Sequence, residues 1–505
     1  MLDGDDLWEL VERRAQATPD GLFAVNEAGR TQSFAEFRDA ALRCAAGLAA
    51  LGIGACTAVS WQLPTRFEAL ILSAALARLG AQQNPLLPML RQRELGFIAR
   101  QTGARFLFAP RAFRGFNYEA LARSVARDLP GLEVWITDDG LPHGDPAALP
   151  PAPAASDEIR WVLYSSGTTA DPKGVRHGDP ALAGAGRAMV QRYELRPEDR
   201  HGFVFPVTHI GGINWLFAGL MAGCAHILIE QFGGEGIALL AQRGATLAGA
   251  GTVFHQAYLA AQRAHPEAKL LPRVRCYPGG GAPKPPQLYH DLLRETGAPI
   301  VSGYGLTEYP IATLGALCDP GEALANSEGR ATAGCQLHIV RQDGAAAKTG
   351  EEGEVRLRGP HLFRGYVDAR LNADAFDGEG FLRTGDLGSL DGAGFLRITG
   401  RLKDVIVRKG ENLSAREIED RLHEQPKIAE AAVIGLPDAE RGELVCAVVA
   451  PRSAEDPPSF EEMNAALRQS GLAVQKLPER LEIVAALPRN ASGKVLKREL
   501  QRRYT

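Results

Sequence analysis

Short apolar segments alternate with helical patterns over the first three hundred residues of the chain. Apolar residues at helical spacing follow Ser33 and Glu36, which match a capping box, and Gly52 ends this pattern. The next predicted elements are a strand at 57–61, a helix around 69–80 and a strand at 106–109. Because such alternation places parallel strands side by side with helices over them, it predicts a parallel sheet covered on both faces.

The pattern changes further along. A Pro- and Ala-rich stretch at 141–155 predicts a surface linker. Strands are then predicted at 161–164, 226–229 and 274–277. From about Gly329 to Gly400, short alternating segments with Gly-rich turns predict a small antiparallel sheet or barrel, with strands at 354–358 and 395–399.

A compact α+β segment is predicted after Arg401. Its expected elements are helices capped by Ser414 with Glu417 and by Ser459 with Glu462, and strands at 431–434 and 445–450. With 505 residues, the chain is too long for one ordinary core. We therefore expect a large N-terminal domain at 1–401 and a small C-terminal domain at 402–505.

Composition and charge argue against several classes of protein. A formal net charge of −4 provides no global attraction to nucleic acid or anionic lipid. Asp3, Asp5 and Asp6 stand where a secretory signal would carry positive charge, and Arg78 interrupts the longest apolar stretch, at 69–81, well short of the roughly 18 residues that cross a bilayer. The seven scattered cysteines, none spaced as CxxC, are typical of reduced small hydrophobes. A cytoplasmic location is the default expectation.

The strongest local signal is a hydroxyl- and glycine-rich loop that follows the predicted strand at 161–164. Its candidate nucleotide-binding residues are Ser165, Ser166, Gly167, Thr168, Thr169 and Lys173. Small residues let backbone N–H groups close around phosphate oxygens, hydroxyls donate further bonds, and a lysine supplies charge. The spacing is not that of a Walker A loop. On composition alone, a surface turn explains the segment equally well.

Five further blocks extend this signal through the chain. They are GGGAP at 279–283, GYGLTE at 303–308, RTGDL at 383–387, GRLKD at 400–404 and PRNASGK at 488–494. With these blocks in this order, the sequence resembles the superfamily of acyl-CoA synthetases, non-ribosomal peptide adenylation domains and firefly luciferase, nearly from end to end. Ala170 departs from the glycine of many members and resembles the loop of cyclohexanecarboxylate-CoA ligases.

The resemblance implies an α/β fold with a large N-terminal domain of two α/β subdomains plus a small β-barrel, and a small mobile C-terminal α+β domain. It also implies ATP and Mg²⁺ as cofactors and coenzyme A as co-substrate. A carboxylate would attack the α-phosphate of ATP, so positive charge is needed where two anions meet.

The resemblance assigns the nucleotide site residue by residue. Glu308 is similar to the Mg²⁺ ligand, Thr307 to an α-phosphate contact and Tyr304 to the aromatic residue beside the adenine. Asp386 would accept hydrogen bonds from the ribose hydroxyls, and Arg401 would contact ribose or phosphate. The other residues assigned to the nucleotide are Gly280, Gly281, Ala282 and Gly305. A solvated glutamate, a core tyrosine and a surface salt bridge are the plain alternatives for these side chains.

The C-terminal blocks imply a moving lysine. Lys494 resembles the lysine that bridges the substrate carboxylate and the α-phosphate, and Lys403 resembles the hinge at which the small domain rotates after adenylation. Gly410 lies where relatives line the coenzyme A channel, although a plain turn explains it as well. His209 aligns with a position beside the acyl site that gates thiol or water access, and a core histidine is its alternative.

The expected substrate is a hydrophobic acid. Amino-acid-activating relatives carry an aspartate just after the His209 block, whereas residues 210–217 here contain no acidic residue. The predicted acyl pocket consists of Ile210, Gly211, Ile213, Trp215 and Phe254. These residues favour a cyclic or medium-chain carboxylic acid.

The sequence therefore leaves three functions open. The first is an acyl-CoA ligase, the second is a stand-alone adenylating enzyme that loads a carrier protein, and the third is a non-catalytic nucleotide-binding protein. A luciferase-like oxidation is formally open. The expected partners are a small-molecule carboxylate, ATP and CoA, without nucleic acid or a membrane span, and a carrier protein and a homodimer stay open.

Overall fold

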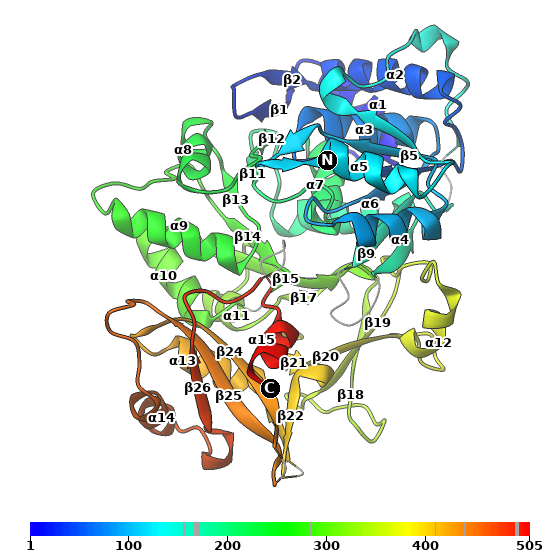
Figure 1. The fold of residues 1–505 in the computed structure, drawn as a ribbon. Coiled ribbons are helices and arrows are strands. Elements are labelled where there is room, and N and C mark those ends of the chain that lie inside the picture. Colours follow the sequence, from blue (N-terminus) through cyan, green and yellow to red (C-terminus); the bar gives the residue numbers. More distant parts are fainter. Residues whose placement is uncertain (155–157, 166–171, 283, 410, 439, 490–493) are drawn as a thin grey trace.

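Two predominantly parallel sheets form the N-terminal half of the computed structural model, which describes residues 1–154, 158–165, 172–282, 284–409, 411–438, 440–489 and 494–505 (Figure 1). The first sheet has the order β13-β11-β12-β1-β2, with β2 antiparallel to β1. The second has the order β10-β9-β4-β3-β5-β8, with β10 antiparallel to β9. Parallel sheets covered by helices are what the strand–helix alternation predicts.

The strands of these two sheets are β1 (Leu22–Asn26), β2 (Thr31–Ser33), β3 (Ala58–Trp61), β4 (Gln82–Pro85), β5 (Phe106–Ala109), β8 (Glu133–Ile136), β9 (Trp161–Ser165), β10 (Lys173–His177), β11 (Arg200–Phe203), β12 (Ala225–Leu228) and β13 (Leu247–Ala248). A small hairpin adds β6 (Ala112–Phe113) and β7 (Phe116–Asn117). The helices up to this point are α1 (Leu7–Ala17), α2 (Phe34–Ala50), α3 (Phe67–Arg78), α4 (Gln92–Thr102), α5 (Tyr118–Arg127), α6 (Asp179–Arg192), α7 (Ile210–Ala222) and α8 (Gly234–Gln242).

The predicted local signals are confirmed in this half. Glu36 N donates to Ser33 Oγ at 3.2 Å and Ser33 N donates to Glu36 Oε2 at 2.7 Å, so the capping box starts α2, and Gly52 follows its end with a φ of +76°. The linker at 141–154 is mostly loop, with one 3₁₀ turn at Pro146–Ala148.

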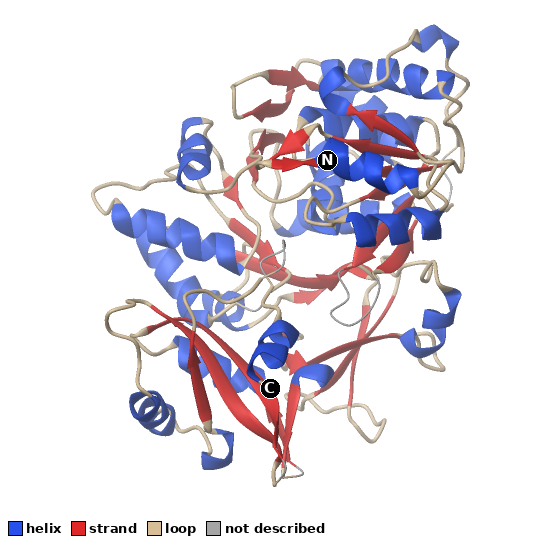
Figure 2. Ribbon diagram, in the orientation of Figure 1, coloured by secondary structure: helices blue, strands red, loops and turns tan. Residues whose placement is uncertain are grey.

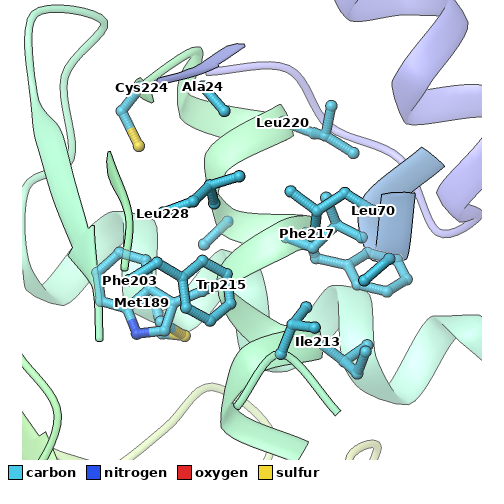
Figure 3. Packing of buried hydrophobic residues seen from close by; sticks show 14 of the residues in the cluster. Ala24, Leu70, Met189, Phe203, Ile213, Trp215, Phe217, Leu220, Cys224 and Leu228 are labelled. Atoms are coloured by element: carbon cyan, nitrogen blue, oxygen red, sulfur yellow. The ribbon is translucent and has the colours of Figure 1, made fainter. Parts of the chain in front are cut away.

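One hydrophobic cluster joins the two sheets. It includes Phe203 and Leu228 from the first sheet, Trp61 from the second, and much of α7. Figure 3 shows Trp215, Phe217 and Leu220 of α7 packed among Phe203, Met189 and Leu70 (Figure 3). Helix α7 is apolar on nearly all sides because it is buried on nearly all sides.

A third sheet of order β14-β15-β16-β17 carries two of the sequence blocks. Its elements and neighbours are β14 (Tyr277–Gly280), β15 (Ile300–Leu306), β16 (Tyr309–Leu314), β17 (Arg330–Ala331), α9 (Thr252–Ala264), α10 (Pro286–Thr296) and α11 (Gly321–Asn326). The prediction of a strand at 274–277 is wrong in its bounds, because the strand lies later in the chain. β14 starts at Tyr277 and pairs through Gly279 and Gly280 with β15. Pro and Gly disfavour strands locally, and pairing with β15 overrides that preference.

The predicted antiparallel strands form a fourth sheet, followed by the C-terminal region. The fourth sheet contains β18 (Gln336–Val340), β19 (Gly353–Arg358), β20 (Leu382–Leu390) and β21 (Leu396–Arg401), with α12 (Asn372–Ala375) beside it. The C-terminal region contains β22 (Val405–Arg408), β23 (Glu411–Ser414), β24 (Ile428–Asp438), β25 (Gly442–Pro451), β26 (Arg480–Ile483), α13 (Ala415–His423), α14 (Phe460–Gln469) and α15 (Lys497–Tyr504). Its long strands are clear in Figure 2 (Figure 2). Further 3₁₀ turns span Thr137–Asp139, Ala369–Leu371, Leu402–Asp404 and Val474–Lys476.

The C-terminal region has hydrophobic clusters of its own. All their members come from residue 406 onward, and the clusters of the preceding regions end at Ile398. The chain passes from β21 to β22 through the 3₁₀ turn Leu402–Asp404, in which Leu402 is 51% exposed. The chain therefore changes core between these strands.

Candidate active site

Thr307 and Glu308 form the tip of the β15–β16 hairpin. Leu306 pairs with Tyr309, so these two residues alone make the turn. A Cβ on Gly305 would collide with the carbonyl oxygen of Pro310, which explains why glycine precedes the tip. The GYGLTE block thus becomes a tight hairpin that projects one hydroxyl and one carboxylate side chain.

Three groups from other segments hold this tip. His177 Nε2 lies 2.7 Å from the Thr307 carbonyl oxygen, which only accepts, so Nε2 carries the proton. The Tyr366 hydroxyl donates to Glu308 Oε1 at 2.7 Å, and Phe363 N donates to the Glu308 carbonyl at 2.9 Å. The His177 ring is fully buried, which lowers its pKa to about 4 and keeps it neutral.

The predicted phosphate loop lies between β9 and β10, which pair antiparallel. Residues 166–171 lie outside the described residues, as does the Ser165 side chain. Lys173 begins β10, and its Nζ lies 5.3 Å from the centroid of the Tyr366 ring. Lys173 and Glu308 therefore contact the same tyrosine, which brings the end of the loop beside the hairpin tip.

Asp386 is the buried carboxylate of the site and is only 3% exposed. Tyr304 donates from its hydroxyl to Oδ2 at 2.7 Å, and Arg401 Nε lies 2.6 Å from Oδ1. Asp386 and Arg401 are paired across β20 and β21, so the sheet register places them together. Burial, followed by the neighbouring Asp386 charge, raises the pKa of Tyr304, which keeps its hydroxyl a donor.

A cavity of about 230 Å³ lies between these strands and the C-terminal region. Its wall includes Gly281 and Ala282 from the turn after β14, Tyr304 and Gly305 from β15, and Asp386 and Arg401 from the fourth sheet. Lys403 lines it from the 3₁₀ turn Leu402–Asp404, and Lys494 and Arg498 line it from the C-terminal end. Segments that are two hundred residues apart in sequence therefore share one cavity.

The cavity carries an excess of positive charge. Burial first, and then the nearby Arg401 guanidinium, lower the pKa of Lys494 to about 8. Burial and Arg401 also lower the pKa of Lys403. Asp386 and Asp404 oppose these effects only in part. A bound anion would favour the charged form of both lysines, so the cavity is suited to phosphate or carboxylate groups.

His209 caps α7. Its Nδ1 accepts from Gly211 N at 3.1 Å, so the ring proton resides on Nε2, and burial lowers its pKa to about 4. A neutral ring with Nδ1 occupied is not a general base at that atom. Its capping role needed the tertiary structure, because histidine is not a common N-cap residue.

The predicted acyl-pocket residues do not line the described cavity. Ile213 is fully buried in the main cluster. Trp215 stacks on His201 at 3.7 Å and on Tyr193 at 5.8 Å, so it packs as a core residue. Phe254 packs edge-on against Phe232 at 4.8 Å. Ile210 is buried at the start of α7, beside Gly211. Gly410, predicted for the coenzyme A channel, lies outside the described residues.

The sequence blocks did not reveal His177 and Tyr366. His177 follows the phosphate loop on β10, and its position in a regular strand carries no local sign of a contact with the hairpin. Tyr366 belongs to an irregular segment between β19 and β20. Neither side chain has a local signal in the sequence. His177 is 130 residues from its partner Thr307, and Tyr366 is 58 residues from its partner Glu308.

The donor set suits a magnesium ion held mainly by phosphates. Among the described residues, no group of three or more His, Cys, Asp or Glu side chains could hold a metal by itself. Glu308 uses Oε1 to accept from Tyr366, and no described residue donates to Oε2. Mg²⁺ keeps several waters and binds through one or two carboxylates plus substrate phosphates, so a single carboxylate oxygen fits it.

The fold and this site define an adenylate-forming enzyme: a glycine-rich loop, a carboxylate-bearing hairpin tip and a cationic cavity that a C-terminal lysine completes. The chain belongs to the AMP-binding enzyme family, whose sequence model matches residues 11–367. The C-terminal domain of AMP-binding enzymes matches residues 417–494. The resemblance drawn from the six blocks is thereby confirmed.

Relatives extend along the whole chain. A medium-chain fatty-acid–CoA ligase of Escherichia coli (strain K12) is 31% identical over 519 residues, covering 99% of this chain and 91% of that protein. An indoleacetate–CoA ligase of Aromatoleum aromaticum is 33% identical and covers 98% of each chain. ATP-bound MatB from Rhodopseudomonas palustris has a TM-score of 0.88 at 26% identity over 98% of this chain and 99% of that one, and apo MatB has 0.78 at 27% identity over 99% of each. In the described part of this chain, no helix is both long and apolar enough to cross a membrane.

Proposed function

We propose that this enzyme activates a hydrophobic carboxylic acid, cyclic or of medium chain length, with ATP and transfers the acyl group to coenzyme A. The position of Lys494 carries the proposal: its side chain reaches the cavity that Asp386 and Arg401 line. The relatives include ligases that form CoA thioesters of fatty and aryl-acetic acids, which supports both the acceptor and the class of acid.

In the first half-reaction, a carboxylate oxygen of the acid bonds to the α-phosphorus of ATP, the bond to the β-phosphate bridging oxygen breaks, and pyrophosphate leaves. Lys494 would offset the charge where the two anions meet, and Lys173 would hold the outer phosphates. Asp386 would accept from the ribose hydroxyls, with Arg401 beside it, while Thr307 would contact the α-phosphate. Mg²⁺, held by Glu308, would neutralise phosphate charge.

In the second half-reaction, the coenzyme A sulfur bonds to the acyl carbon, AMP leaves, and the thiol proton goes to solvent. The hinge proposal for Lys403 is supported by the short turn Leu402–Asp404 and by the change of core beside it. We place the domain boundary there, at 401/402. The higher TM-score with ATP-bound than with apo MatB supports an adenylation orientation for this structure.

The acid is proposed to be hydrophobic because the start of α7 offers no counter-charge. Among residues 210–217 the only polar side chain is Asn214, which is buried. A buried substrate ammonium would lack a partner there, at a cost of several kcal/mol. His209, with its proton on Nε2, would stand at the entrance to this region as a donor.

The decisive experiment measures pyrophosphate release with ATP and Mg²⁺ over short, medium and long fatty acids, cyclohexanecarboxylate, benzoates and amino acids, each with and without coenzyme A. We expect one hydrophobic class to release pyrophosphate and to yield AMP and a thioester with coenzyme A. Adenylation that coenzyme A does not stimulate would favour a carrier-protein acceptor. ATP binding without any adenylation would contradict the ligase proposal.

A further inference from the structure

Residues 363–367 form a strap segment that contacts both the phosphate-loop strand and the hairpin tip. Its backbone bonds to β10 are Arg364 N to Arg176 O at 2.8 Å, Arg176 N to Gly365 O at 3.2 Å and Val367 N to Gly174 O at 2.8 Å. Its bond to the tip is Phe363 N to Glu308 O at 2.9 Å. A Cβ on Gly174 would lie 2.8 Å from Val367 Cγ2, so glycine lets the strap close onto the strand.

Tyr366 is the centre of this strap and is only 5% exposed. Its hydroxyl donates to Glu308 Oε1 at 2.7 Å, and its ring faces the Lys173 ammonium at 5.3 Å from the centroid. A tyrosine hydroxyl is protonated at neutral pH, so in this bond it is the donor and the carboxylate oxygen is the acceptor. One residue thus fixes both a carboxylate and a cation of the proposed phosphate site.

We infer that Tyr366 is a positioning residue that fixes the Glu308 carboxylate and leaves Oε2 as the one oxygen for the divalent cation. The inference rests on the proposed function, in which Glu308 holds Mg²⁺. Without the hydroxyl, the carboxylate would rotate among several conformers and would have to be ordered when the ion binds. Preorganisation of this kind improves affinity by reducing the ordering cost.

The test is binding of Mn²⁺, a stand-in for Mg²⁺, followed by electron paramagnetic resonance in the presence of saturating α,β-methylene ATP and no acid. Tyr366→Phe removes the hydroxyl and keeps the ring beneath Lys173. We expect its Mn²⁺ dissociation constant to rise roughly 3- to 10-fold, less than for the loss of a direct hydrogen bond to a charged group, because the hydroxyl acts on the cation only through the order of the carboxylate. Tyr118→Phe is the matched control, because the Tyr118 side chain is also buried and its hydroxyl donates to Pro88 O at 2.6 Å, between the start of α5 and the loop that precedes α4.

A Tyr366→Phe protein that binds Mn²⁺ as tightly as the wild type would overturn the inference. Glu308→Asp is a second variant: its shorter side chain draws the carboxylate away from Tyr366, and wild-type affinity there would overturn the inference too. Glu308→Gln separates the two levels of the argument. If Glu308→Gln binds Mn²⁺ normally, the metal role in the proposed function fails; if it binds weakly while Tyr366→Phe binds normally, only the positioning role fails.

Discussion

Arg401 and Asp386 face each other across β20 and β21, with 2.6 Å between Nε and Oδ1, at the wall of the cavity that Lys494 enters. The backbone register between β20 and β21 sets the position of this ion pair, and the side chains that line the cavity do not. Tyr304 completes it from the other side by donating to Oδ2. The carboxylate is therefore held in one orientation before any nucleotide binds.

Substitution of Asp386 by Asn should weaken ATP binding. The amide retains the volume but loses the charge that Arg401 and the ribose hydroxyls contact, and charge-assisted hydrogen bonds contribute about 1.5–3 kcal/mol. We expect the KM for ATP to rise roughly 10- to 100-fold. Asp319→Asn is the control, because Asp319 is also a buried partner of an arginine, with Arg330 Nη2 at 2.6 Å from its Oδ1, but lies outside the cavity lining. Equal effects of the two variants on KM would contradict the ribose role.

Lys494→Ala should lose adenylation and retain thioester formation from supplied acyl adenylate. Removing one well-placed charge from a preorganised site costs on the order of 3 kcal/mol, or more than 100-fold in rate. The two half-reactions are measured separately, by ATP–pyrophosphate exchange and by AMP release with coenzyme A. Lys476→Ala, which removes an ion pair with Glu417 in the same region, should change neither. Equal loss of both half-reactions would show that the role is misassigned.

The adenylation rate should fall as pH rises through about 8. The Lys494 pKa is lowered to about 8, so the ammonium is present below that pH and is lost above it. We expect kcat/KM, which reports the free enzyme, to show a descending limb there. Lys494→Arg should be slower but should lack this limb, because arginine stays charged. A wild-type profile that keeps rising between pH 8 and pH 9.5 would contradict the assignment.

Stability should decrease as pH falls from 7 towards 5. Burial lowers the pKa of His177, His209, His226 and His255 to about 4 and lowers that of His201 well below its ordinary value. Below the unfolded-state pKa of about 6.5, the unfolded chain binds protons that the folded chain does not. This lowers the free energy of unfolding by on the order of 1–2 kcal/mol per histidine at pH 5. Asp179, whose pKa burial raises to about 6, acts in the opposite direction, as do Asp6, Glu230 and Glu328, whose pKa values burial also raises, whereas the lowered pKa of buried His361 adds to the histidine effect.

Melting temperatures at pH 7 and pH 5 measure this dependence. His201→Phe, which retains the stacking on Trp215, should reduce the difference between the two temperatures, whereas His265→Gln, at an exposed position, should not. A protein equally stable at both pH values would show that the buried rings take up protons without cost.

Much of the fold could be predicted from local signals. The capping boxes at Ser33 and Ser459 start helices where expected, because a cap satisfies N–H groups within the same turn. The strand at Phe106–Ala109 was predicted to the residue, since a buried parallel strand is a continuous apolar run. The shift of β14 shows the limit: a strand of Pro and Gly exists only because β15 pairs with it.

The candidate site divides in the same way. The sequence by itself determined the order of elements, the glycine-rich loop and the residue types that the chemistry needs, because these depend on composition and spacing within a few residues. Only the tertiary structure decided that Trp215 packs in the core, that His209 caps a helix, and that Tyr366 holds Glu308. Those relationships join segments far apart in the chain, and the strand register and side-chain packing that bring them together have no local signature.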